Sequence, residues 1–311
     1  MLNTFYLLFF YFLFNFCNAE DISEEIKVVL LGGGLGNQMF QYAFGIALER
    51  KLGKKVLFDN TYFEYAKRLH KNEKLEDSNG RQWRNYGLDI FNLDIKFANE
   101  KELDIAKKNT ILEKYYCYYD ENILKNYNGS SYYKYNFQNE KYFKEYKNEI
   151  KRMFTFPEIS KTDEFNQKWL NKIRSTSNSV LINIRRGDYE KIGWTISINY
   201  YKRAIEYIKK KVKDPIFFVI CQHCKEYVEK EFNIDTTFEF IGEINSTKHE
   251  DWKDIVLMKE CKYAIISNST FAWWAAWLGR ANEEGFVIAP TPFVKDKDDI
   301  ICENWIKINS Q

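Results

Sequence analysis

The chain has 311 residues, enough for one large domain or two of ordinary size. Hydrophobic residues make up 45% and aromatic residues 18%, which is ample for a sizeable core. Acidic and basic residues nearly cancel, and a formal net charge of +2 argues against a general nucleic-acid binder, which needs a basic excess or patch.

The N-terminus differs from the rest of the chain. Residues 5–14, FYLLFFYFLF, are wholly apolar, and CNA at 17–19 resembles a small-residue cleavage site before Glu20. The pattern predicts a signal peptide at residues 1–19, since the apolar run is shorter than the roughly 20 residues that cross a bilayer. Because MLNT carries no Lys or Arg, an uncleaved signal anchor is the alternative. We therefore expect a secreted protein or one in the lumen of the secretory pathway, of Golgi type, with membrane contact only through this segment if it stays uncleaved.

Residues 27–58 predict a strand-loop-helix-strand unit. KVVLL reads as a short buried strand, and the glycines that follow it read as a turn. From Asn37 onward, apolar residues recur at the i, i+3, i+4 spacing of a helix face. Gly53 ends that helix, and KVLF resumes strand character. Such a unit is typical of the start of an α/β domain.

The middle of the chain, from about residue 60 to 155, has a weaker pattern. It is rich in Tyr, Asn and Lys, as in KYYCYYDENILKNYNGSSYYKYNF, and we expect mixed helix and loop there. It ends as an amphipathic helix before a predicted domain boundary near residue 157. Residues 20–157 would then form an N-terminal α/β half, and residues 158–311 a C-terminal half.

Beyond residue 157, strands and helices alternate regularly. Strands are predicted at 180–184, 216–220, 238–242, 263–267 and 286–290, and helices at 199–212, 225–232, 250–262 and 269–279. This alternation implies a parallel sheet covered on both faces, which is a doubly wound domain. Ligands of such domains bind beyond the carboxyl ends of the strands.

Two adjacent arginines follow the first of these strands, in RRGDY at 185–189. Arg presents a planar fork of donors that fits phosphate oxygens and stays charged at any working pH. A diphosphate at Arg185 and Arg186 is therefore one prediction. The alternative is that one or both arginines pair with Asp188 or another carboxylate, because Arg is rarely fully buried unless paired.

A second polar group, SNST at 267–270, lies between a predicted strand and a helix. Hydroxyls and free N–H groups at a helix N-terminus form an anion site, so Asn268, Ser269 and Thr270 are candidate ligand-binding residues. Ordinary N-capping is the alternative, although one such residue would suffice for it. The tryptophans of the following helix are expected in the core.

The glycine turn GGGLGNQ at 32–38 departs from the dinucleotide-binding pattern because the third glycine position is Asn37, and no GK[ST] follows. We expect a turn that brings backbone close to a ligand, with Gly34, Asn37 and Gln38 at the start of the helix. An oxidoreductase is the weakest alternative that this turn leaves open.

Five cysteines lie beyond the predicted leader, so at least one is unpaired. CQHC at 221–224 is a C-x-x-C motif between a strand and a helix, as in thioredoxin-like redox sites. No second C-x-x-C supplies the further ligands of a zinc site, and we predict no metal site. Structural cysteines, a local disulfide and redox chemistry stay open.

Taken together, GGGLGNQMFQYAFG, NIRRGDY and ISNSTFAWWAAWLG resemble the α-1,2-fucosyltransferases of glycosyltransferase family 11, in order and in separation, over about residues 28–290. The resemblance implies a GT-B-like α/β fold, with two Rossmann-like halves whose parallel sheets face each other across a cleft. It implies inverting transfer of L-fucose from GDP-β-L-fucose to the 2-hydroxyl of a terminal galactose on a glycan, with no metal or other cofactor. The N-terminal half would then hold the acceptor and the C-terminal half the GDP-fucose.

The resemblance also implies residue roles. Arg185 would bind the β-phosphate and stabilise the departing GDP, and Asp188 would position the loop or the nucleotide. The resemblance does not identify the base that takes the acceptor proton; Asp188 is a candidate because such a base must be an acid within hydrogen-bond reach of the acceptor hydroxyl. The further substrate-binding residues that it implies are Arg186, Gly34, Asn37, Gln38, Asn183, Asn268, Ser269 and Thr270.

Two positions depart from the family pattern. The family usually has His two residues before the first arginine, where this chain has Asn183, and Asn cannot act as a general base near neutral pH. The family often has Ser-Asp-Asp where this chain has Cys221-Gln222-His223. These departures leave open a degenerate glycan-binding or partner-binding protein, although both arginines and SNST are retained. A transferase that uses the same donor on another hydroxyl is the other alternative.

Overall fold

The computed structural model describes residues 25–72, 83–125, 128–221, 225–232, 236–242, 250–295 and 297–311. The leader predicted at residues 1–19 lies outside these ranges, so the export signal and the location in the secretory pathway stay predictions. Within the described ranges, no helix combines the length and the apolar character needed to cross a membrane.

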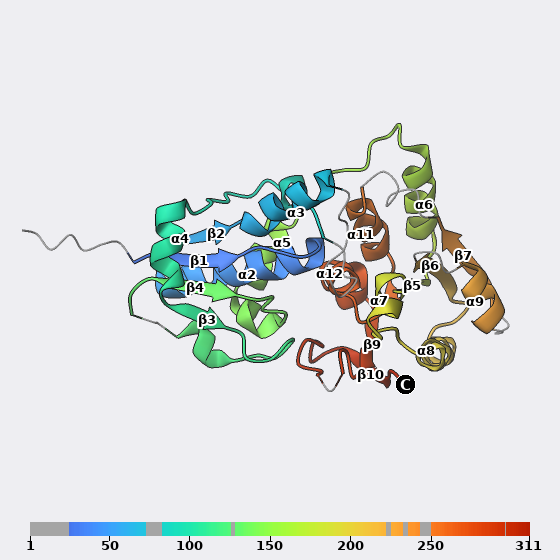
Figure 1. The fold of residues 1–311 in the computed structure, drawn as a ribbon. Coiled ribbons are helices and arrows are strands. Elements are labelled where there is room, and N and C mark those ends of the chain that lie inside the picture. Colours follow the sequence, from blue (N-terminus) through green and yellow to red (C-terminus); the bar gives the residue numbers. More distant parts are fainter. Residues whose placement is uncertain are drawn as a thin grey trace, which may run out of the picture.

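The N-terminal half is built on a four-stranded parallel sheet with the strand order β2-β1-β4-β3 (Figure 1). Its strands are β1 (Lys27–Leu30), β2 (Val56–Asp59), β3 (Thr110–Leu112) and β4 (Ser131–Lys134). Its α-helices are α2 (Leu35–Leu52), α3 (Thr61–Lys71), α4 (Glu100–Lys107) and α5 (Lys147–Met153), and short 3-10 helices lie at Leu88–Ile90, Glu121–Leu124, Glu140–Tyr142 and Lys144–Tyr146. Val29 of β1 packs in the core that includes α2, whereas Val28 packs against Leu103 of α4. The two helices therefore cover opposite faces of the sheet.

The first strand-loop-helix-strand unit is confirmed almost residue for residue. Gly34 precedes α2 in an extended conformation, and Gly53 ends it in the left-handed region with φ of 62°. Twelve of the 18 residues of α2 are buried. A helix with so little exposed surface is expected between two layers rather than on one face of a domain.

The prediction of only helix and loop for residues 60–155 is wrong at β3 and β4. Strand β4 lies in the middle of the sheet beside β1, and Ser131, Tyr132 and Tyr133 are all buried. These residues do not form an aliphatic run, which is why the sequence pattern did not reveal the strand. The Tyr132 hydroxyl donates to Asp59 at 2.7 Å, so this tyrosine is buried without losing a hydrogen bond.

The C-terminal half is the predicted doubly wound domain. Its six parallel strands have the order β10-β9-β8-β5-β6-β7. The strands are β5 (Ser179–Ile184), β6 (Ile216–Cys221), β7 (Phe238–Ile241), β8 (Tyr263–Ile265), β9 (Phe286–Thr291) and β10 (Ile306–Asn309), of which only β10 was not predicted. The helices are α6 (Glu164–Ser175), α7 (Asp188–Lys191), α8 (Ile198–Lys211), α9 (Lys225–Phe232), α11 (Trp252–Lys259) and α12 (Thr270–Leu278), with a 3-10 turn at Arg280–Asn282.

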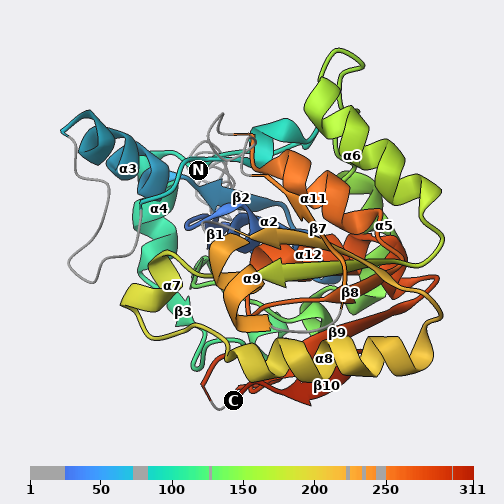
Figure 2. The ribbon, with the colours of Figure 1, turned by 90° about the vertical axis from the view of Figure 1, so that its right-hand side faces the viewer.

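Helices cover both faces of this sheet, as Figure 2 shows. Alternate residues of β5 divide between the faces: Val180 and Ile182 pack against α8, while Leu181 packs in the core that includes α6, α11 and α12. The expectation of two parallel-sheet α/β halves in a GT-B-like arrangement is confirmed.

The two halves meet along α2 and α12, which lie side by side in the centre of Figure 1. The predicted core tryptophans Trp273, Trp274 and Trp277 are completely buried. The indole of Trp274 donates to the carbonyl of Gly36 at 2.9 Å, and the ring of Phe40 lies 4.6 Å from that of Trp273. One core cluster therefore continues from one half into the other. The boundary near residue 157 falls between the last strand of the first sheet and the first strand of the second, and it stays a prediction.

The described cysteines include both free thiols and a disulfide-bonded residue. Cys117, Cys261 and Cys302 are buried free thiols. Burial raises the pKa of Cys261 well above the usual range of a thiol, so it packs as a small apolar side chain. Cys221 is disulfide-bonded, and its partner lies outside the described residues, as do Gln222, His223 and Cys224.

Candidate active site

Each sheet has one point at which its strand order reverses. In the C-terminal half the chain moves outward from β5 through β6 and β7 and then returns to β8 on the other side of β5. In the N-terminal half the corresponding point lies between β1 and β4. Open α/β sheets bind ligands beyond the carboxyl ends of the strands at such switch points. RRGD follows β5 and SNST follows β8, so the structure brings both predicted motifs to the same switch point.

Asn37 connects the two switch points. Its side-chain oxygen accepts a hydrogen bond from the amide of Gln138, which follows β4, at 2.9 Å. The same oxygen accepts from the hydroxyl of Thr270, at the start of α12, at 2.9 Å. The first turn of α2 is thus held by groups from both halves. Two helix N-termini, those of α2 and α12, meet here, and each carries a partial positive charge.

Arg185 lies at the carboxyl end of β5 and is about three-quarters buried. Its guanidinium donates to Oδ1 of Asp188 at 2.6 Å. Oδ2 of the same carboxylate accepts from Arg84 of the N-terminal half at 3.1 Å. The ring of Tyr189 lies beneath Arg185, 5.2 Å from the guanidinium carbon, and burial raises the pKa of Tyr189 to about 12. Asp188 therefore holds two arginines from different halves in fixed positions.

Arg186 points in another direction. Its guanidinium lies over the ring of Tyr227 in α9, 3.7 Å from the ring centre, and forms an ion pair with Glu190. Both arginines thus have the carboxylate partners that the sequence left open as an alternative to phosphate. Each keeps about a quarter of its side chain exposed, so an anion at the switch point can still reach them.

Ser267, Asn268 and Ser269 of the SNST segment are buried, and Ser269 is 8% exposed. Ser269 precedes α12, yet its hydroxyl does not cap the helix, so the simple N-capping alternative does not describe its side chain. The amide of Asn268 donates to the carbonyl of Trp194 at 2.8 Å, while its oxygen is buried with no hydrogen-bond partner among the described residues. Thr270 is committed to Asn37. The N–H groups at the start of α12 are what this segment offers to an anion, with the largely buried hydroxyl of Ser269 beside them.

Asn183 lies under the sheet rather than at its open edge. It is 8% exposed, and its side-chain oxygen accepts from the hydroxyl of Ser267 at 2.7 Å. Its amide nitrogen faces the sulfur of Met258 in α11 at 3.8 Å. The observed partners of Asn183 are therefore structural, and its predicted contact with substrate stays a prediction.

The glycine turn is held from below by Gln38. Gln38 is fully buried: its amide donates to the carbonyls of Gly33 and Asn85, and its oxygen accepts from the N–H of Gly87. Gly33 has φ of 73°, a left-handed conformation that favours glycine. Gly34 faces open space, because a side chain there would meet nothing within 4 Å. Gln38 thus positions the turn, and Gly34 is the residue that a ligand can approach.

Sequence analysis missed three residues that the structure brings to this region. Arg84 follows a segment with no regular pattern, so no sequence feature marks it as a site residue. Gln138 lies in the aromatic segment YNFQNEKYF, and the polar residues within that segment could have indicated it. The third is Glu113, which follows β3 and is 7% exposed. Burial raises its pKa to about 7, against the hydrogen bonds that it accepts from two backbone N–H groups.

The site is chemically suited to a diphosphate ester. Arg185 and the N-terminus of α12 present positive charge and donors at one switch point, and the glycine turn of the other half stands opposite. Arg186 is turned toward Tyr227 and keeps about a quarter of its side chain exposed. In the part of the chain that the structure describes, no three His, Cys, Asp or Glu side chains gather as a metal site would need. The residues present would hold the phosphates through guanidinium and backbone groups.

A model of glycosyl transferase family 11 matches residues 12–309. The chain belongs to this family. It is 33% identical over 303 residues to an alpha-1,2-colitosyltransferase of Escherichia coli, covering 91% of this chain and 99% of the relative. It is 27% identical over 141 residues to the galactoside alpha-(1,2)-fucosyltransferase 1 of Mus musculus, covering 42% of this chain and 37% of that protein. Among solved structures, the fucosyltransferase NodZ of Bradyrhizobium is similar with a TM-score of 0.46 and 11% identity, over 82% of this chain and 94% of that one.

The predicted family and enzyme class are therefore confirmed: the protein is a family 11 glycosyltransferase. Its retained motifs are the ones that the structure gathers at the two switch points. The roles of individual residues, the donor and the acceptor are matters of proposal.

Proposed function

We propose that this enzyme transfers L-fucose from GDP-β-L-fucose to the 2-hydroxyl of a terminal galactose on a glycan, with inversion at the transferred carbon. Membership of family 11 supports the reaction class, and a fucosyltransferase of galactosides is among the relatives. The observation that carries the proposal is the position of Arg185. It stands at the carboxyl end of β5, at the switch point, beside the N-terminus of α12.

The chemistry follows from that position. The bond between the sugar and the diphosphate breaks as the acceptor oxygen attacks from the opposite face, and the acceptor hydroxyl releases its proton. Negative charge then grows on the departing β-phosphate oxygen. A fixed guanidinium stabilises that charge more in the transition state than in the ground state, which lowers the barrier. We propose that Arg185 does this and that Arg186 and Ser269 bind the rest of the diphosphate, without a required metal.

Asp188 supports this role as a positioning residue. Both of its oxygens accept from guanidinium groups, one from Arg185 and one from Arg84. A carboxylate engaged in this way keeps Arg185 aimed at the phosphate site. This assignment is preferred to a role for Asp188 as the base that takes the acceptor proton, because a proton on either oxygen would weaken an ion pair that holds an arginine.

A second donor is favoured by one observation. The relative that matches nearly the whole chain at 33% identity is named a colitosyltransferase. Colitose differs from fucose in lacking the 3-hydroxyl, so the same diphosphate site would serve both donors. GDP-colitose is therefore the alternative donor.

The test is transfer by the full chain from GDP-fucose and from GDP-colitose to lactose, with and without EDTA. The variants are Arg185→Ala and Arg174→Ala, the latter a control that breaks a surface ion pair with Glu260. We expect transfer that survives EDTA, falls by about 10²–10³ in Arg185→Ala, as for loss of an oxyanion donor, and is unchanged in the control. GDP binding without any transfer would support the degenerate binding protein, and faster transfer of colitose would support the alternative donor.

A further inference from the structure

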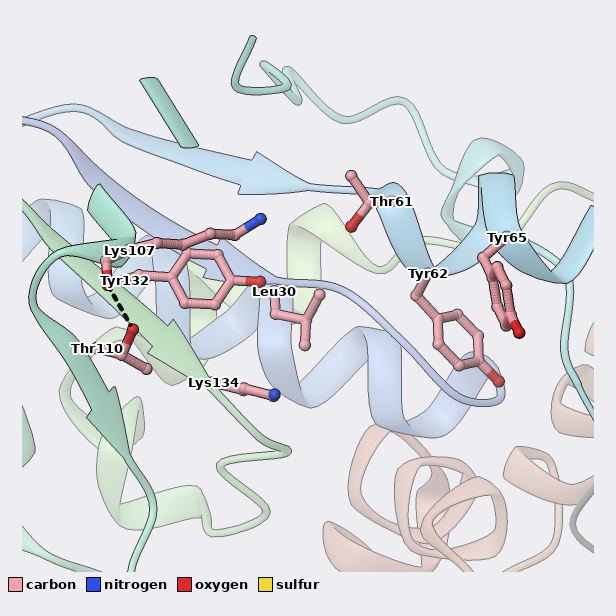
Figure 3. A pocket seen from close by; sticks show the side chains of 8 residues that line it. All are labelled: Leu30, Thr61, Tyr62, Tyr65, Lys107, Thr110, Tyr132 and Lys134. Carbon is pink, nitrogen blue, oxygen red and sulfur yellow. Dashed lines mark hydrogen bonds between the residues drawn. The ribbon is translucent and has the colours of Figure 1, made fainter. Parts of the chain in front are cut away.

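A pocket of about 480 Å³ opens on the N-terminal half, away from the diphosphate site (Figure 3). Leu30 and Tyr132 of the sheet form its floor. Tyr62 and Tyr65 of α3 stand on one side, and Lys107 and Lys134 on the other. A volume of this size is in the range of small-ligand sites and holds one or two sugar rings.

The charge of the pocket is positive. Lys134 is exposed, and no acidic side chain of the described ranges pairs with it. Lys107 is 44% exposed, and its nearest carboxylate is Asp59 at 3.8 Å. Asp59 is itself 1% exposed and already accepts from the hydroxyl of Tyr132 and the N–H of Thr61. Asp59 does not line the pocket, whereas Lys107 and Lys134 do.

The tyrosines provide surfaces on which a sugar can pack. Tyr65 is 47% exposed, and its ring is held edge-on by Trp83 at 5.3 Å. The ring of Tyr62 packs beside Gly32 of the glycine turn. An aromatic face packs against the C–H face of a sugar ring, while the tyrosine hydroxyl stays available for hydrogen bonds.

Tyr62 also connects the pocket to the reaction site. Its hydroxyl accepts from the backbone N–H of Arg84 at 3.3 Å, and the side chain of Arg84 pairs with Asp188 beside Arg185. A ligand that extends from the switch point along α3 therefore reaches Tyr62 first and the two lysines last. A negative charge at the lysines would then sit on a part of the acceptor removed from the hydroxyl that reacts.

We infer that the acceptor is an anionic glycan, whose charged group binds Lys107 and Lys134 while its sugar rings pack on Tyr62 and Tyr65. This inference rests on the proposed glycosyl transfer and adds the substrate class of its acceptor. The charged group is a sugar carboxylate or a phosphate ester, both of which accept hydrogen bonds from ammonium groups. A nucleic acid is not the ligand, because the pocket is small and the chain carries a net charge of only +2.

The experiment compares three β-galactosides with the full-length enzyme: neutral lactose, galactosyl-glucuronic acid and a lactose phosphate ester. The variants are Lys107→Met with Lys134→Met, and Tyr65→Ala. Lys101→Met is the matched control, an exposed lysine in the first turn of α4, the helix that ends at Lys107. Kinetics of transfer, hydrolysis of GDP-fucose without acceptor, and binding of each glycan by NMR are measured for each protein.

We expect the wild type to show a lower KM for one or both anionic acceptors than for lactose. The double lysine variant should raise that KM by roughly three- to tenfold, as for loss of exposed ion pairs, with kcat, lactose KM and donor hydrolysis unchanged. Tyr65→Ala should weaken all three acceptors. The carboxylate and phosphate arms identify which anion the pocket prefers.

The inference would be overturned by equal KM values for neutral and anionic acceptors. It would also be overturned if Lys101→Met raised the KM for anionic acceptors as much as the double lysine variant does. A wrong proposed function would be recognised differently: the wild type would neither hydrolyse GDP-fucose nor transfer fucose to any of the three acceptors. In that case the NMR binding measurements still test whether the pocket binds anionic glycans. The double lysine variant must then bind an anionic glycan more weakly than the wild type, and the Lys101→Met control must not.

Discussion

Arg84 of the N-terminal half lies 3.1 Å from Asp188 of the C-terminal half, and the other oxygen of that carboxylate accepts from Arg185 at 2.6 Å. Arg185, which we propose binds the diphosphate, is thus held through one carboxylate by the opposite half of the molecule. Because the three charges share one network, a change in the distance between the halves changes the position of Arg185. Donor binding and the relative position of the halves are therefore expected to be coupled.

Replacing Arg84 with Ala should lower kcat/KM for transfer while leaving the fold intact. Asp188 would keep Arg185 but lose the donor that fixes its second oxygen, and hydrogen bonds to charged groups contribute about 1.5–3 kcal/mol. We expect a loss of roughly ten- to a hundredfold, measured by steady-state kinetics. Arg174→Ala is the control for loss of an arginine ion pair elsewhere. If both variants keep wild-type kcat/KM, Arg84 does not position the site.

Asn37 is the second connection between the halves. Two variants of this residue, Asn37→Leu and Asn37→Asp, test the hydrogen bonds that it accepts. Asn37→Leu leaves the amide of Gln138 and the hydroxyl of Thr270 without their acceptor. Unsatisfied donors cost about 1–3 kcal/mol, so the free energy of unfolding in urea should fall by that amount. Asn37→Asp keeps the accepting oxygen near the N-terminus of α2 and should stay close to wild type. Equal stability of the two variants would show that these hydrogen bonds contribute nothing.

The two motifs of the C-terminal half could be predicted because each is local. An apolar run predicts the strand, the polar residues after it mark the carboxyl end, and parallel strands place those ends together. Arg185 and Ser269 were therefore expected at one edge of the sheet from the sequence alone. The side chain of Asn183, which lies within the same strand, instead bonds to Ser267 and faces Met258, and the local pattern could not reveal this.

The connections between the halves could not be predicted, because they depend on tertiary structure. Asn37 and Thr270 are 233 residues apart in the chain, and Arg84 and Asp188 are 104 apart. No local pattern relates such pairs. Strand β4 was missed for a different reason: its buried residues are a serine and two tyrosines rather than aliphatic residues, and the Tyr132 hydroxyl meets its acceptor, Asp59, only in the tertiary structure.

Gly36 should be the most sensitive glycine at the contact of α2 with α12. A methyl group there would lie 2.7 Å from the backbone carbon of Thr270 and 2.8 Å from the N–H of Phe271. These are backbone atoms, so α12 would have to move. We expect Gly36→Ala to lower the free energy of unfolding by roughly 1–3 kcal/mol, as in overpacked cores. For this stability measurement Gly34→Ala is the control, since a methyl group there meets nothing within 4 Å; a stable Gly36→Ala would mean that the two helices can separate without cost.

Glu113 should make stability depend on pH in an unusual direction. Its side chain is 7% exposed, one carboxyl oxygen accepts from the N–H groups of Asn136 and Phe137, and the other has no partner in the described ranges. Burial raises its pKa from 4.5 to about 7, so the folded protein holds a proton that the unfolded chain releases. The stabilising contribution is then complete below about pH 4.5 and is lost as pH rises through 7, by up to roughly 3 kcal/mol.

Glu113→Gln removes this titration while keeping an oxygen for the two N–H groups. Between pH 4.5 and 8 the wild type should lose stability relative to Glu113→Gln, measured as the difference in their urea unfolding free energies at each pH. Glu121→Gln, at an exposed position of the same half, should follow the wild type. Parallel curves for the wild type and Glu113→Gln would mean that the buried carboxyl is ionised at neutral pH. The oxygen that lacks a partner would then have to be satisfied by a group outside the described residues or by water.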